Sequence, residues 1–145
     1  MVIGIFGESC TGKSTLADKL KERLNAQVYT GKDYLRLEKS EAAARLSFQT
    51  KLRDAVHGEA VIYVISEKEH LSLLPEGAVR VLVTADLETI KARFAQRMRG
   101  NLPAGVAAML EQKHGCFDGE PHHIHVISGH TDLDDVCGAI IGRAR

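Results

Sequence analysis

The stretch VIGIFGESCTGKST, residues 2–15, decides the fold of this chain. Its apolar start, Val2–Phe6, has the length of a strand, and its continuous hydrophobicity is typical of a strand covered on both faces. Residues 7–14 then match the pattern G-x-x-x-x-G-K-[ST] at every fixed position. A helix is expected to begin near Lys13, so the motif lies between a strand and a helix, the setting that its chemistry requires.

The residues of this loop predict a phosphate-binding site. Gly7 and Gly12 allow the backbone to curl so that successive N–H groups point inward, and the start of the helix adds a positive partial charge. Lys13 is expected to reach the β- and γ-phosphates of a nucleotide, and the Ser14 hydroxyl to bind a Mg²⁺ ion that bridges them. The nucleotide-binding residues predicted in this way are Gly7, Glu8, Ser9, Cys10, Thr11, Gly12, Lys13, Ser14 and Thr15.

The rest of the chain alternates apolar runs with helical patterns, which indicates an α/β fold with parallel strands and crossover helices. Leu16, Leu20 and Leu24 recur every fourth residue among charged neighbours and predict one amphipathic helix. Further strands are expected at residues 27–29, 60–65, 79–84 and 124–127.

Composition narrows the classes of function. The 145 residues suit one domain, and 44% of them are hydrophobic, as in ordinary globular proteins. Nineteen basic residues balance nineteen acidic ones, so we expect neither a nucleic-acid polymer nor a membrane surface as partner. No apolar run approaches the length of a membrane span. Three irregularly spaced cysteines argue against a disulfide framework and favour a reducing, cytoplasmic location.

The loop at residues 7–14 resembles the Walker A motif of P-loop nucleoside triphosphate-binding proteins. Further along, the segment Tyr29–Arg36 resembles the Ser-Thr-Gly-Asp-x-x-Arg stretch of nucleoside monophosphate kinases, with Lys32 as one inserted residue. The resemblance is therefore to small P-loop kinases of the nucleoside monophosphate kinase-like and shikimate kinase-like group. It implies a three-layer α/β/α fold whose five-stranded parallel sheet has the order 2-3-1-4-5, in a single domain over residues 1–145.

The same resemblance implies roles on the acceptor side of the reaction. Asp33 would orient or deprotonate an acceptor hydroxyl, and Arg36 would bind an acceptor anion. The alternative is structural: Asp33 would cap the next helix, and Arg36 would lie on its solvated face.

A basic segment follows the fourth expected strand. Thr84-Ala85-Asp86 precedes a helix that carries Arg93 and Arg97 on one face, and then residues 100–103. This layout resembles the helix and lid of small kinases, and it implies a short lid near residues 97–105. Arg97 would stabilise the charge of the phosphoryl group in transfer, and residues 128–131 would hold the donor base. The alternative is an ordinary basic helix face.

Some features depart from related families. The only asparagines, Asn25 and Asn101, are not followed by Lys, which argues against guanine recognition by an Asn-Lys-x-Asp motif. The third strand runs into Ser66 and Glu67 instead of an acidic pair. Ser66 with Glu69 has the spacing of a helix capping box, and the alternative is that Ser66 contacts Mg²⁺. Several histidines near residues 122–130 lack zinc-site spacing and are interpreted as surface or strand-edge residues.

The sequence thus predicts a phosphotransferase that moves the γ-phosphoryl group of MgATP to a small metabolite or nucleotide. Lys13, Asp33 and Arg97 are the expected catalytic residues, Asp33 and Arg36 the expected acceptor-binding residues, and Ser14 the metal ligand. The alternative is an ATP-binding regulatory protein or slow ATPase without an acceptor. The identity of the acceptor and the oligomeric state do not follow from these residues.

Overall fold

The computed structural model describes residues 1–143. The strands are β1 (Val2–Phe6), β2 (Gln27–Thr30), β3 (Val61–Ile65), β4 (Val79–Thr84) and β5 (Ile124–Ile127). The α-helices are α1 (Lys13–Leu24), α2 (Glu41–Ala55), α3 (Leu87–Arg97), α4 (Ala104–Lys113) and α5 (Leu133–Arg143), and two 3₁₀ helices are η1 (Asp33–Leu37) and η2 (Lys68–Leu73). The predicted strands are confirmed to within one residue at each end.

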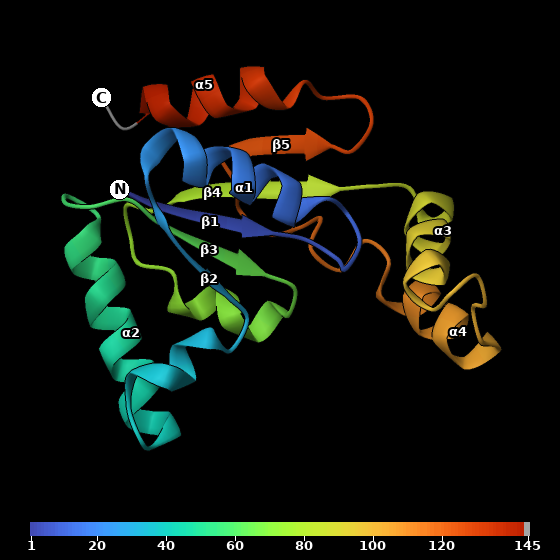
Figure 1. Ribbon diagram of the computed structural model, residues 1–145, viewed down its shortest axis with the longest axis horizontal. Helices are drawn as coiled ribbons and strands as arrows, with labels where there is room; N and C mark the ends of the chain where they lie inside the picture. The colour runs from blue at the N-terminus through green and yellow to red at the C-terminus, as the bar shows by residue number, and fades with distance from the viewer. Residues whose placement is uncertain (144–145) are drawn as a thin grey trace.

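The five strands form one sheet in the order β2-β3-β1-β4-β5, and every neighbouring pair is parallel (Figure 1). The predicted fold class and strand order are therefore confirmed. β1 lies in the middle of the sheet, and its residues are fully buried because helices cover both of its faces. Ligands of parallel α/β sheets bind beyond the carboxyl ends of the strands, where strand order reverses. The loop after β1 emerges at this edge.

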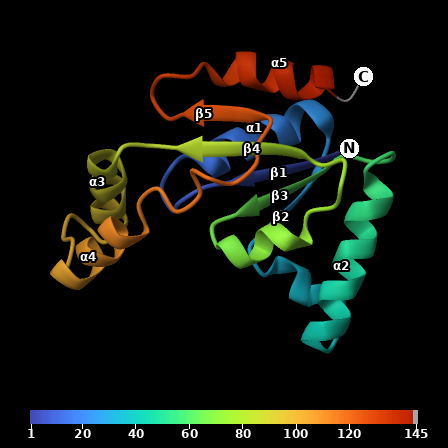
Figure 2. The same ribbon diagram turned by 180° about the vertical axis from the view of Figure 1, so that it is seen from behind.

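Two apolar clusters cover the two faces of the sheet. On one face, α1 and α5 pack on the alternate side chains of the strands, such as Ile3, Ile5 and Val81. On the other face, α2, η1 and η2 cover Phe6, Tyr63 and Leu82. Figures 1 and 2 show the sheet between these two layers from opposite sides. The three-layer arrangement follows from strands that are apolar on both sides.

α3 and α4 lie beyond the sheet, at the carboxyl ends of the strands (Figure 1). They pack on each other through a third apolar cluster, in which Ile90 and Leu110 are buried with Ala85 and with Cys10 from the loop after β1. The segment predicted as a lid, residues 97–105, corresponds to the turn that joins the two helices. Its closure over a ligand stays a prediction.

One predicted helix start is wrong. Ser66 does not cap η2, because that helix begins at Lys68 and its preceding residue, Glu67, makes no capping hydrogen bond with its side chain. Ser66 instead follows β3 directly and faces the carboxyl edge of the sheet, where it lines a cavity.

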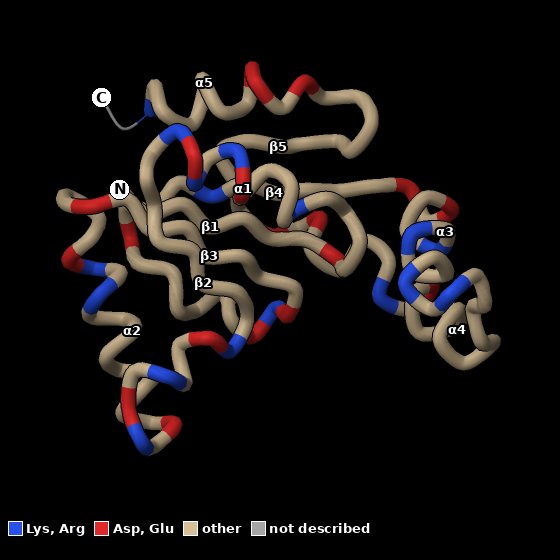
Figure 3. Tube along the Cα trace, viewed as in Figure 1, with Lys and Arg blue, Asp and Glu red and all other residues tan. Residues whose placement is uncertain are grey.

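Charged residues are scattered over the helices and loops, whereas the strands are almost free of them (Figure 3). Arg80 in β4 is the one Lys, Arg, Asp or Glu in the strands of the described chain. Basic and acidic positions alternate along the trace of the described residues, in agreement with the balanced composition, so local groupings of charge carry the electrostatic argument.

Candidate active site at the carboxyl ends of the strands

The loop after β1 is tightly held against the sheet. A Cβ atom on Gly7 would lie 2.1 Å from the carbonyl oxygen of Val83 in β4, so only glycine fits at this position. Gly12 precedes α1 with φ of 100°, a left-handed conformation that glycine adopts without steric cost. The Thr11 hydroxyl is buried and donates to the Glu8 carbonyl at 2.8 Å. Together these contacts fix the curled loop that the motif predicts.

Lys13, the first residue of α1, is 6% exposed. Its ammonium group donates to the carbonyl oxygens of Gly7 at 2.9 Å and Glu8 at 2.5 Å. Burial lowers the pKa of Lys13 to about 8, and the nearby Arg97 charge lowers it further, whereas Cys10 and Glu8 act in the opposite direction. An ammonium group has three donors. Two hold the loop, and the third remains to bind an anion.

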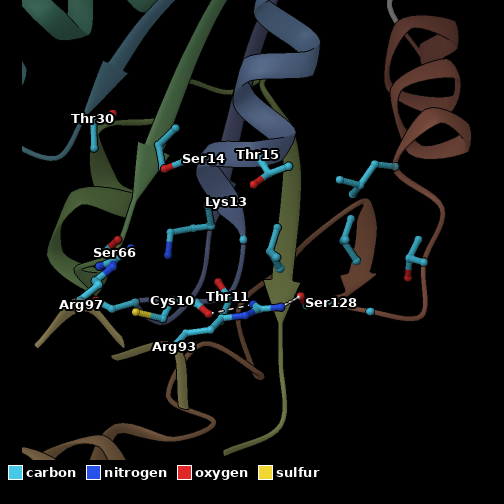
Figure 4. Close-up of a pocket in the computed structure, with 18 of the residues that line it drawn as sticks. Cys10, Thr11, Lys13, Ser14, Thr15, Thr30, Ser66, Arg93, Arg97 and Ser128 are labelled. Atoms are coloured by element: carbon cyan, nitrogen blue, oxygen red, sulfur yellow. Dashed lines mark hydrogen bonds between the residues drawn. The ribbon is translucent and has the colours of Figure 1, made fainter. Parts of the chain in front are cut away.

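A cavity of about 830 Å³ opens beside the loop (Figure 4). One end is formed by Thr30, the last residue of β2, and by Ser66, which follows β3. The other end is formed by Ser128, Gly129 and Thr131, which follow β5. The loop residues Ser9 to Thr15 lie between them. The cavity therefore has room for a ligand that extends from the phosphate loop toward both edges of the sheet.

Arg93 of α3 connects the phosphate loop with the segment after β5. Its guanidinium group donates to the Cys10 carbonyl at 3.0 Å and to the Ser128 hydroxyl at 2.9 Å, as the dashed lines in Figure 4 show. The helical spacing puts Arg93 and Arg97 on one face but does not indicate the partners of either. The structure places both in the lining of the cavity.

Arg97 lies on the side of the cavity where Ser66 is found (Figure 4). It is exposed at the end of α3. The predicted catalytic residues Lys13 and Arg97 therefore share one cavity, and the positive charge of Arg97 acts on Lys13.

Asp33 and Arg36 lie outside the residues that line this cavity. The Asp33 carboxylate accepts a hydrogen bond from the backbone N–H of Thr30 at 2.9 Å, and the Arg36 Nε donates to the Asp33 carbonyl at 3.2 Å. Arg36 is largely solvated. Thr30 does line the cavity, and the Asp33 carboxylate is hydrogen-bonded to its backbone N–H, so Asp33 lies next to the residue that forms this part of the cavity wall.

Two loop residues have features that the motif did not indicate. The Glu8 carboxylate points away from the phosphate loop and is bound by the His114 ring at 3.1 Å and by the Gly115 N–H at 3.2 Å. Cys10 has φ of 64°, a left-handed conformation unusual for a residue other than glycine. Both residues connect the loop to the α3–α4 pair.

The charged residues that line the cavity are Lys13, Arg93 and Arg97, and no Asp or Glu is among the lining residues. Protein sites for Mg²⁺ normally supply one or two carboxylates. The cavity offers hydroxyl groups, including that of Ser14, which suit a Mg²⁺ ion brought in on a nucleotide but do not form a resident metal site. Within residues 1–143, no group of three or more His, Cys, Asp or Glu side chains is arranged to hold a metal ion.

Comparisons with known proteins agree with this geometry. No protein-family model matches the sequence. A shikimate kinase from Pelotomaculum thermopropionicum is 26% identical over 167 aligned positions, which cover 97% of this chain and 92% of the relative.

The solved structures with this fold include a shikimate kinase from Acinetobacter baumannii in complex with shikimate, with a TM-score of 0.63 at 15% identity over 98% of this chain and 91% of that one. A gluconokinase from Sinorhizobium meliloti has a TM-score of 0.62 at 14% identity, covering 99% of this chain and 90% of the other.

This chain is similar to small P-loop kinases of the shikimate kinase-like group. The predicted resemblance is thereby confirmed, and the comparisons support a small-molecule kinase. The named relatives act on different compounds, so the likeness favours a reaction class and not an acceptor. In the described part of the chain, no helix is long and apolar enough to cross a membrane.

Proposed function

We propose that this protein transfers the γ-phosphoryl group of ATP to a hydroxyl group of a small metabolite. The observation that carries the proposal is the grouping of Lys13, Arg93 and Arg97 around a curled loop, in a cavity lined by no carboxylate. Such a cavity favours a polyanion. Inward backbone N–H groups and the start of α1 add to this preference.

The middle of the cavity suits the phosphates of the donor. The loop from Gly7 to Thr15 would surround them, and Lys13 would donate its third N–H to an oxygen of the β- or γ-phosphate. The Ser14 hydroxyl is exposed at the start of α1 and would bind the Mg²⁺ ion that accompanies the nucleotide. Residues 128–131, at the far end, would hold the adenine base, with Arg93 positioning this segment against the loop.

The opposite end of the cavity suits the acceptor. In the transfer, the acceptor oxygen forms a bond to the γ-phosphorus, the bond from that phosphorus to the bridging oxygen breaks, and ADP leaves. Arg97 would stabilise the charge on the phosphoryl oxygens during this step. Asp33 would take the proton of the acceptor hydroxyl once its carboxylate turns from Thr30 toward the cavity.

The second candidate is a P-loop regulatory protein that binds ATP and hydrolyses it slowly. The position of Asp33 favours this candidate, because the Asp33 carboxylate is held by the Thr30 N–H outside the cavity, and the residues that line the cavity include no Asp or Glu. The similarity to metabolite kinases supports the first candidate.

An experiment with labelled ATP separates the two. The protein is incubated with γ-labelled ATP, Mg²⁺ and pooled hydroxylated metabolites, and the products are resolved by chromatography. The phosphotransferase transfers label to a small molecule, and EDTA stops the transfer because the phosphoryl charge is no longer neutralised. Label that appears on inorganic phosphate alone would assign the protein to the second candidate.

A further inference from the structure

Side chains hold carbonyl groups of the phosphate loop in fixed orientations. The Lys13 ammonium group binds the carbonyl oxygens of Gly7 and Glu8, and the Arg93 guanidinium group binds that of Cys10 at 3.0 Å. Lys13 belongs to the loop motif, whereas Arg93 comes from α3, 83 residues further along the chain than Cys10. In a trans peptide the C=O and the following N–H point in opposite directions. Each held carbonyl therefore fixes the direction of the next N–H.

Cys10 is the residue of the loop whose backbone conformation conflicts with its side chain. Its φ of 64° lies in the left-handed region, which a residue with a side chain adopts at a cost. At an ordinary negative φ, the peptide between Cys10 and Thr11 would be rotated, and its carbonyl would no longer face Arg93. A hydrogen bond from a charged donor is strong enough to offset this cost. The bond from Arg93 therefore favours the left-handed conformation of Cys10.

The Arg93 side chain is itself fixed at this place. It also donates to the Ser128 hydroxyl at 2.9 Å, so the planar guanidinium group is held at two points (Figure 4). The guanidinium group lies against the loop, because a Cβ atom on Gly12 would be 3.9 Å from Arg93 Nη1 and 3.7 Å from Ser128 Oγ. The orientation of the Cys10 carbonyl therefore depends on the position of α3, which carries Arg93.

We infer that Arg93 is a positioning residue of the phosphate loop: it holds the Cys10 carbonyl so that the Thr11 N–H is turned toward the bound phosphates. The inference rests on the proposed function, since it concerns the same nucleotide site. Without the guanidinium group, Cys10 would return to a negative φ, and the Thr11 N–H would no longer face the phosphates. This role differs from attraction of the phosphates by charge, which any cation at the same place would supply.

Paired backgrounds at Cys10 separate orientation from charge. Arg93→Met is made in Cys10→Gly and in Cys10→Ala, which both lack the thiol and differ in how freely residue 10 adopts a positive φ. Titration calorimetry at pH 7 with Mg²⁺ measures the affinity for ATP and for inorganic tripolyphosphate, which has no base or ribose.

We expect Arg93→Met to reduce both affinities by a factor about fivefold larger in the alanine background than in the glycine background, because the glycine loop keeps its shape without the arginine. The same charge is removed in both backgrounds, so charge alone predicts equal losses. Losses equal to within about twofold, as for independent sites, would overturn the inference.

Arg93→Lys in the same two backgrounds provides a second measurement, because lysine keeps the charge but has no planar fork. It should also weaken binding more in the alanine background than in the glycine background. Circular dichroism checks that each variant folds, and the lysine pair decides the question if a methionine variant does not. A lysine change with the same effect in both backgrounds would assign Arg93 a role through its charge alone and overturn the inference.

The outcomes also distinguish this inference from the proposed function. If neither ATP nor tripolyphosphate binds to the wild-type protein, the nucleotide site itself is refuted and the inference falls with it. If both bind and the two backgrounds respond equally to the loss of the arginine, the nucleotide site stands and the inference alone is wrong.

Discussion

Lys13 carries its charge in a buried position, against the carbonyl oxygens of the phosphate loop. Burial lowers its pKa to about 8 from an ordinary value of 10.5. Below pH 8 the free protein holds the ammonium form that binds phosphate. Above pH 8 the free protein loses this proton, and nucleotide binding must take a proton up again.

The first prediction concerns this titration. ATP affinity should fall by about tenfold between pH 7 and pH 9, because one proton per site is taken up on binding above the pKa of the free lysine. Calorimetry in two buffers of different ionisation enthalpy measures both the affinity and the proton uptake. Lys13→Arg is the control, since arginine stays charged over this range. A wild-type affinity as constant with pH as that of the arginine variant would contradict the lowered pKa.

Cys10 shows a conflict between backbone and packing. Its left-handed φ of 64° costs a side-chain-bearing residue about 1 kcal/mol, whereas glycine adopts it freely. Cys10→Gly should therefore be more stable than Cys10→Ala, by about 0.5–1 kcal/mol, in urea unfolding. Cys137 in α5 is the matched control, because glycine is less favourable than alanine inside a helix, so the order should reverse there. The same order at both positions would show that the loop conformation is not strained.

Asp33 separates the two candidate functions. If it acts as the base, Asp33→Asn should leave ATP affinity nearly unchanged and lower the transfer rate by about 10²-fold, the lower part of the range for a lost general base. Arg36→Ala should mainly raise the KM of the acceptor, because an anion clamp binds ground and transition states alike. Rates of labelled transfer measure both effects. Unchanged rates in both variants would leave Asp33 with a purely structural bond to Thr30.

At the scale of elements, the α3–α4 pair decides whether the two arginines reach the cavity. Arg93 and Arg97 are both carried by α3, whose first turn is fixed by the Asp86 cap. The pair is joined to the phosphate loop by Cys10 in its apolar cluster and by the bond of Glu8 to His114. Loosening α3 should therefore affect the nucleotide site.

Two helix caps test this coupling. Asp86→Ala removes the cap of α3, and Ser40→Ala removes the hydroxyl that accepts from the Ala43 N–H at the start of α2, at 3.1 Å. Each change should lower the Tm by about 2–4 °C. Only Asp86→Ala should also weaken ATP binding, by about threefold or more, because α2 contributes no residue to the cavity lining. Thermal unfolding measures the change in Tm, and titration calorimetry measures the ATP affinity. Equal ATP affinities of the Asp86→Ala and Ser40→Ala variants would exclude the coupling.

Elements were easier to predict than the contacts between them. The strands could be located because each is a continuous apolar run, and the loop at residues 7–14 because its pattern is local. Arg93 could not be assigned from the sequence, since its hydrogen-bond partners, Cys10 and Ser128, lie far along the chain. Ser66 lines the cavity together with the phosphate loop, from which it is separated by more than fifty residues of sequence. Ser66 even has the spacing of a helix cap, although the helix begins two residues later.

At the scale of the whole molecule, the parallel sheet brings distant residues together at one edge. The ends of β1, β2, β3 and β5 supply the loop, Thr30, Ser66 and Ser128, and α3 adds its arginines from beyond β4. The result is a cationic cavity on a molecule whose total charge is zero at pH 7. The central claim is that this cavity binds the phosphates of a nucleotide.

Calorimetric titration of ATP into the wild-type protein and the Lys13→Ala variant tests that claim most directly, with circular dichroism to check that the variant folds. We expect the wild-type protein to bind ATP and ADP but to bind adenosine far more weakly, because the loop and the cations act on the phosphates. The variant should lose at least tenfold in ATP affinity while keeping its fold, since Lys13 faces the loop and not the apolar core. A folded variant that binds ATP as tightly as the wild-type protein would contradict the account.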